Sequence, residues 1–213
     1  MSEREDRPAV PPWDRRETPG LFDVETSARR IGHYKWFEMR LFEILGGWTA
    51  EVPEPDVKLR LGAYSAHHAW HAEQWHHRLP ELADLNPAGL TVPANTELEA
   101  FVAALSAPTD PGSTVEKLVG VYRVAVPWSV AAYTFHLHRA SAVADAPTIR
   151  TLRQVLADLA EDGRDGEMLV QSMLGSAADV ERAAAHQARL EALMVAAGGI
   201  AGPGSAGGSA SAG

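Results

Sequence analysis

The chain of 213 residues contains no cysteine. This absence excludes disulfide bonds, thiolate nucleophiles and thiolate metal sites, so histidine and carboxylate side chains are the strong metal ligands that remain. The sequence also lacks any apolar run close to the ~18 residues that a membrane-spanning helix needs, and its charged, proline-rich start has no signal-peptide core. We therefore expect a cytoplasmic protein that has no membrane partner.

Positive charge is also scarce. Lysine and arginine number 19 against 28 aspartate and glutamate residues, which gives a net charge of -9. A chain of this charge repels phosphate backbones, so no nucleic-acid partner is expected. Hydrophobic residues make up 46% of the chain, enough to bury the core of one domain.

No stretch of the sequence is typical of a β-strand, and apolar residues recur instead at helical spacing. A long excursion rich in Pro, Asn and Gly separates the second and third long helices, which suits a bundle whose second helix pair must cross over. We predict an all-α fold, a four-helix bundle with one crossover connection plus a C-terminal fifth helix. The long helices are expected over residues 26–45, 55–79, 115–139, 147–174 and 177–197, with a short one at 97–105.

Glycine and proline set the boundaries of these elements. Gly46 and Gly47 are expected to end the first helix, and Pro127 is expected to kink the third. Three regions follow from the composition: a disordered arm rich in Pro and charge (1–22), the helical bundle (23–197) and a flexible Gly/Ala/Ser tail (198–213).

The most informative stretch is residues 61–79, LGAYSAHHAWHAEQWHHRL, which holds five of the nine histidines. His68 and His71 lie on the same helical stripe as Leu61 and Trp75, at positions where a bundle helix normally carries leucine. Spaced three residues apart, the two imidazoles project from one face and can share an ion.

Two acids occupy similar positions on other helices. Glu38 follows the apolar line of the first helix, and Asp162 follows that of the fourth. Glu38, His68, His71 and Asp162 are therefore candidate ligands of one metal ion in the bundle core. The alternative is a buried network of ion pairs and hydrogen bonds that includes Tyr34 and Tyr64 and holds no metal.

The remaining histidines are weaker candidates. Glu73 and His76 form a Glu-x-x-His string, but Glu73 lies about 200° around the helix from His71 and is expected to face solvent. The others are interpreted as surface, helix-interface or partner-facing side chains: His67, His76, His77, His136 and His138.

Residues 24–174 resemble the ferritin-like superfamily, whose bundles place Glu, Glu-x-x-His, Glu and Glu-x-x-His on successive helices around two irons. Glu38 matches the first glutamate, and His71, followed by Arg78-Leu79, matches the second-helix histidine. His68 takes the position of the second-helix glutamate. On the fourth helix, within the string that begins at Asp158, Leu159 replaces the glutamate and Asp162 the histidine.

The third helix departs furthest from that pattern, because residues 117–144 contain no Asp or Glu. The resemblance therefore implies a degenerate two-iron motif that binds one Fe or Mn ion, or none. It suggests a metal-dependent oxidoreductase that acts on a small organic substrate; the alternative is a metal-free interaction or small-molecule-binding protein. A homodimer is expected on general grounds, with Trp70, His76 and His77 available for the interface.

Overall fold

The computed structural model describes residues 21–80 and 86–203; these residues form helices joined by loops and contain no strand. The prediction of an all-α fold is confirmed. None of the described helices combines the length and apolar character that a membrane crossing requires.

Helices α1 (Val24–Glu51) and α2 (Pro55–His76) form the first pair. Asp23 caps α1 by accepting a hydrogen bond from the backbone N–H of Thr26 at 2.6 Å, so the helix begins slightly before the predicted start. The predicted end at residue 45 is wrong. The helix continues through Gly46, where a Cβ atom would lie 3.1 Å from Ser65 Oγ, so this glycine permits close packing against α2 instead of ending the helix.

The crossover contains α3 (Pro87–Leu90), α4 (Thr96–Ser106) and a 3₁₀ turn (Pro111–Ser113). It leads into a third long segment made of α5 (Thr114–Val119), a π-helical stretch (Gly120–Ala125) and α6 (Val126–Arg139). The expected kink at Pro127 stays a prediction, but a π-helical stretch ends two residues before the proline. A π-helix adjusts the hydrogen-bond register where Pro127 supplies no backbone N–H.

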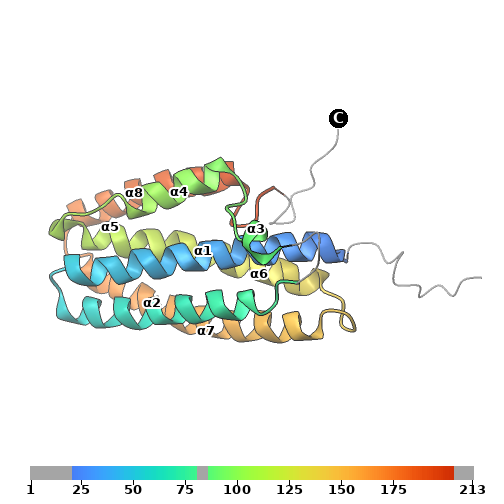
Figure 1. Cartoon of the computed structure of the whole chain (residues 1–213). Helices are drawn as coiled ribbons and strands as arrows, with labels where there is room; N and C mark the ends of the chain where they lie inside the picture. The colour runs from blue at the N-terminus through green and yellow to red at the C-terminus, as the bar shows by residue number, and fades with distance from the viewer. Residues whose placement is uncertain (1–20, 81–85, 204–213) are drawn as a thin grey trace, which may run out of the picture.

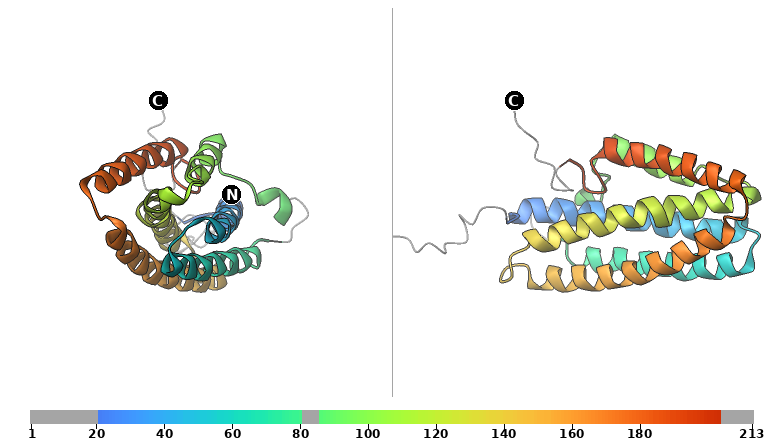
Figure 2. Two further views of the ribbon diagram at one scale, coloured as in Figure 1. Left: turned by 90° about the vertical axis from the view of Figure 1, so that its left-hand side faces the viewer. Right: turned by 180° about the vertical axis from the view of Figure 1, so that it is seen from behind.

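Helices α7 (Ala146–Met173) and α8 (Ala177–Ala197) complete the fold, close to their predicted bounds. α1 packs on α2, and α7 contacts both α2 and α6, so these long elements run side by side (Figure 1). α4 and α8 lie next to each other as a further layer against the α5 side of the molecule (Figure 2).

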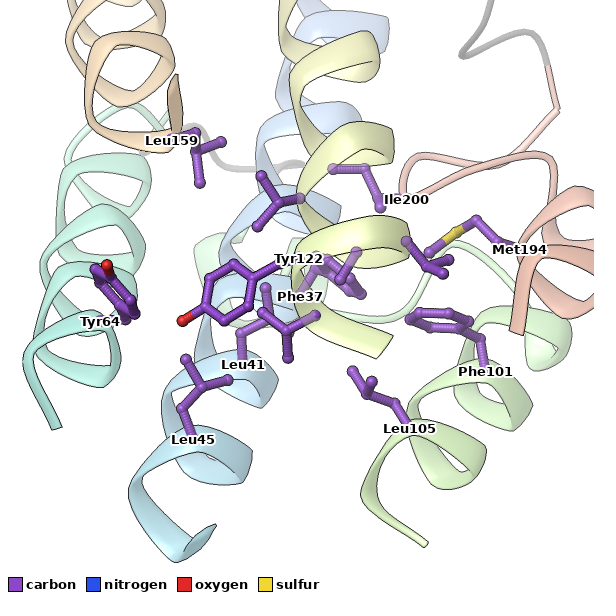
Figure 3. Close-up of a cluster of buried hydrophobic side chains, with 14 of the residues drawn as sticks. Phe37, Leu41, Leu45, Tyr64, Phe101, Leu105, Tyr122, Leu159, Met194 and Ile200 are labelled. Atoms are coloured by element: carbon purple, nitrogen blue, oxygen red, sulfur yellow. The ribbon is translucent and has the colours of Figure 1, made fainter. Parts of the chain in front are cut away.

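A continuous apolar core joins the long helices to the layer formed by α4 and α8 (Figure 3). Phe37 of α1 packs against Phe101 of α4 with ring centroids 6.2 Å apart. Ile200, which follows α8, is fully buried in the same core. Residues 198–203 therefore belong to the folded part, unlike the flexible tail predicted from residue 198.

The predicted arm and tail otherwise fall outside the described residues, at 1–20 and 204–213, and stay predictions there. Within the predicted arm, Phe22 is described, and it is packed. Its backbone N–H donates to the Arg139 carbonyl at 3.0 Å, and its ring meets Phe135 edge-on at 5.8 Å.

Two glycines of α7 provide a matched test of this packing. A Cβ atom on Gly166 would overlap the Tyr122 ring, whereas one on Gly163 would meet Val126 at 3.4 Å, an ordinary contact. We expect Gly166→Ala to lower the free energy of unfolding by about 1–3 kcal/mol through overpacking. Gly163→Ala should be neutral or raise it by up to about 1 kcal/mol through helix propensity. Urea unfolding of both variants checks this, and equal effects would contradict the packing described for Tyr122.

Candidate metal centre

Glu38, His68 and His71 converge between α1 and α2, and each offers a ligand atom within 4.8 Å of the others. Their exposed fractions are 0%, 2% and 0%. Two imidazoles and one carboxylate at such burial need partners, because an unpaired charge in the interior is costly. The structure thus brings together three of the four residues predicted to form a metal site.

Both oxygens of Glu38 accept hydrogen bonds. His68 Nδ1 lies 2.5 Å from Glu38 Oε2, and the Tyr133 hydroxyl of α6 donates to Oε1 at 2.5 Å. Burial by itself raises the pKa of Glu38, but the adjacent His68 and His71 outweigh burial and hold it well below its usual range. Glu38 is therefore an ionised carboxylate in the centre of the protein.

His71 contacts two carboxylates through different ring atoms. Its Nε2 lies 3.2 Å from Asp158 Oδ2 of α7, while its Nδ1 lies 3.5 Å from Glu38 Oε2. The Nδ1 atom is buried and makes no hydrogen bond. Burial lowers the pKa of His71, yet Glu38 and Asp158 together raise it above its ordinary value.

Asp162, the fourth predicted ligand, is not part of this group. Its carboxylate is buried and pairs with His67, whose Nδ1 lies 2.8 Å from Oδ2. Burial raises the pKa of Asp162 despite the opposing effect of His67. His67 is half exposed, so the partner of this buried acid is in contact with solvent.

Two further residues touch the triad, Asp158 and Tyr133, and the helical pattern of the sequence does not mark either as a ligand. Asp158 lies one turn before Asp162 but off the apolar line of α7, and its side chain is 37% exposed. Tyr133 lies in the acid-free third segment, where an aromatic residue is normally interpreted as core. Burial, followed by the charge of Glu38, raises the Tyr133 pKa far above its usual value, which keeps the hydroxyl protonated as a donor.

Two weaker candidates have clear outcomes. Glu73 is 65% exposed, as predicted, and lies 3.9 Å from His77. His136 is fully buried and lies between α6 and α1, with Nε2 3.2 Å from Ser27 Oγ, so it fits the helix-interface interpretation and not the surface one. Burial, with a contribution from nearby Arg30, lowers the pKa of His136 to about 3.

Tyr133 can be tested by removing its hydroxyl. We expect Tyr133→Phe to lower the free energy of unfolding by about 1.5–3 kcal/mol, the usual contribution of a hydrogen bond to a charged group. Tyr122→Phe is the matched control, since the Tyr122 hydroxyl is buried without a hydrogen-bond partner, and its removal should cost little. Chemical denaturation measures both, and a smaller loss for Tyr133→Phe than for the control would contradict the contact with Glu38.

His136 predicts a pH dependence. Its folded pKa of about 3 lies below the ordinary 6.5, so its contribution to stability is complete above pH 6.5 and is lost as pH falls towards 3. Between pH 7.5 and pH 5 this single group should remove about 2 kcal/mol of stability. His136→Gln should lose correspondingly less over the same interval, as measured by urea unfolding at both pH values. Identical losses in the two proteins would show that His136 is accessible to protons when folded.

Comparisons of the chain with protein-family models, with curated proteins and with solved structures found no match. The chemistry of the site is therefore inferred from its own residues and their geometry.

Proposed function

We propose that the protein binds one divalent metal ion at Glu38, His68 and His71 and acts as a metal-dependent oxidoreductase on a small organic substrate. The observation that carries the proposal is His71 Nδ1, a buried ring nitrogen that makes no hydrogen bond and lies 3.5 Å from a carboxylate oxygen. Buried polar atoms in proteins normally have partners. Several other buried atoms of this protein also lack one, but His71 Nδ1 faces a carboxylate within a group of three metal-ligand side chains, which favours a cation there.

The ring orientation of His71 supports a metal. Asp158 accepts a hydrogen bond only if His71 Nε2 carries a proton, which leaves the lone pair of the neutral ring on Nδ1. That lone pair then faces Glu38 Oε2, and two electron-rich atoms are adjacent in a site without solvent. A cation between them relieves the repulsion. A carboxylate that orients a ligating histidine through its other nitrogen is a recurring feature of metal sites.

The donor set also suits the proposal. Two imidazoles and one carboxylate are typical ligands of Fe or Mn, and three protein ligands leave coordination positions open. When bound, such an ion supplies Lewis acidity and, for Fe or Mn, electron transfer. Tyr133 holds Oε1 of Glu38, so Oε2 is the oxygen that faces both imidazoles.

A ferritin-like bundle is the architecture we propose for this site. It is supported by the long helices α1, α2 and α7, and by a crossover that precedes the α5–α6 segment. Residues 117–144 supply no carboxylate, and Tyr133 reaches the centre from that segment instead. The proposal is accordingly a single-metal centre rather than a two-iron one. The predicted homodimer and cytoplasmic location also remain predictions.

One observation favours the alternative, a metal-free small-molecule-binding or interaction protein. Both Glu38 oxygens already accept hydrogen bonds. If His71 carries a second proton, on Nδ1, this atom faces Glu38 as part of a positively charged ring, and no metal ion is needed between them. The raised pKa of His71 is consistent with that proton. Metal and proton thus compete for the same site, and metal affinity should weaken as pH falls.

Metal analysis separates the two functions. After loading with Mn²⁺ or Fe²⁺ and gel filtration, we expect about one ion per wild-type chain, and a loss of at least tenfold in affinity in Glu38→Gln and in His71→Gln. His67→Gln is the matched control: it removes another histidine of α2, whose partner is Asp162, and should retain the ion. Absence of metal from the wild type, or equal binding by all variants, would contradict the proposal. Circular dichroism confirms that each variant is folded.

Metal removal gives an independent readout. A ligand present at about 100 times its dissociation constant stabilises a protein by about 2.7 kcal/mol. For a chain of this length that corresponds to roughly 5–10 °C in Tm. We expect EDTA to lower the Tm of the loaded wild type by this amount and to leave His71→Gln unchanged. An EDTA effect of equal size in both proteins would show that the chelator acts elsewhere.

A further inference from the structure

A groove of about 650 Å³ runs between the C-terminal end of α2 and the N-terminal part of α7. Its volume is in the range of sites that enclose small organic ligands, about 300–1,000 Å³. The side chains that line it combine charge, amide groups and one large aromatic ring: Trp70, Gln74, Arg78, Arg150, Thr151 and Gln154.

Two arginines, Arg78 and Arg150, line the groove. Within residues 21–80 and 86–203, neither Arg78 nor Arg150 forms an ion pair or a side-chain hydrogen bond, and Arg78 Nε is buried without a partner. Five other arginines each pair with a carboxylate: Arg29, Arg40, Arg60, Arg123 and Arg182. In a chain of net charge -9, two guanidinium groups that line one groove without an acidic partner among the described residues favour an anion there.

Two residues that line the groove are neighbours of the proposed metal site. Trp70 precedes His71 in the chain, and their rings lie 5.6 Å apart between centroids. Gln154 lies one helical turn before Asp158, the acid that bonds His71 Nε2. A molecule in the groove would therefore have its cationic contacts at one end and the triad near the other.

We propose that this groove binds a small organic anion, whose carboxylate or phosphate pairs with Arg78 and Arg150 while its apolar body lies against Trp70. Guanidinium groups match the planar geometry of carboxylates and the oxygens of phosphates, and an indole presents a large apolar face. The inference rests on the proposed function in that it names the substrate class of the metal site. The binding step itself requires only the groove.

Calorimetric titration of the full chain, freed of metal by chelation, tests the binding step. The probes are benzoate, phenyl phosphate, neutral benzamide and inorganic phosphate. We expect at least one aromatic anion to bind at least tenfold more tightly than benzamide and inorganic phosphate, and the tighter of the two identifies the charged group that the groove prefers. If neither benzoate nor phenyl phosphate binds more tightly than benzamide, the inference is overturned.

Two variants on α7 locate the site. Arg150→Gln should weaken binding of the preferred anion at least tenfold. Arg153→Gln removes the same charge from the same helix, but Arg153 lines a neighbouring hollow rather than the groove, so it should change affinity less than twofold. Equal losses in both variants would show that the anion responds to overall charge and not to this groove.

A second titration, with Mn²⁺-loaded protein, separates this inference from the proposed function. Anion binding without Mn²⁺ uptake supports the groove and removes the metal function. Mn²⁺ uptake without anion binding supports the metal site and overturns the groove. When both bind, the anion should alter the electron paramagnetic resonance spectrum of the bound Mn²⁺, and an unaltered spectrum would contradict the placement of the groove beside the triad.

Discussion

The ion pairing of Glu38 is the constraint on which the centre of this protein depends. An ionised carboxylate without solvent contact has to be neutralised by its neighbours, and here His68, His71 and the Tyr133 hydroxyl surround it. These partners come from α2 and α6, so the charge of one residue on α1 links three helices. Loss of any partner leaves a buried charge incompletely satisfied, which makes the arrangement specific as well as costly to alter.

The same constraint connects structure to function. Asp158 of α7 holds His71 from the outer side, and the ring then presents its other nitrogen to Glu38. Either a metal ion or a proton can complete that contact. The groove proposed to bind an anion is lined by Trp70, whose ring lies 5.6 Å from that of the same histidine between centroids.

Much of the fold and part of the site could be predicted from the sequence. Glu38, His68 and His71 lie on helical lines of mainly apolar residues, and this periodicity predicts that they are in the core. Asp162 followed the same rule, and it is buried, but the rotation and height of α7 direct it to His67 and bring Asp158 to His71. These two contacts, Asp162 with His67 and Asp158 with His71, depend on how the helices pack against one another. Gly46 likewise could not be distinguished from a helix end without knowing that Ser65 packs against it.

The metal centre is tested most directly by a crystal structure of the Mn²⁺-loaded protein with an anomalous difference map. We expect one anomalous peak in contact with His71 Nδ1, His68 and Glu38 Oε2, with the Asp158 contact to His71 Nε2 preserved. A map with no peak at this position, and with His71 Nδ1 donating a hydrogen bond to Glu38, would contradict the metal centre and establish the triad as a buried proton-linked network.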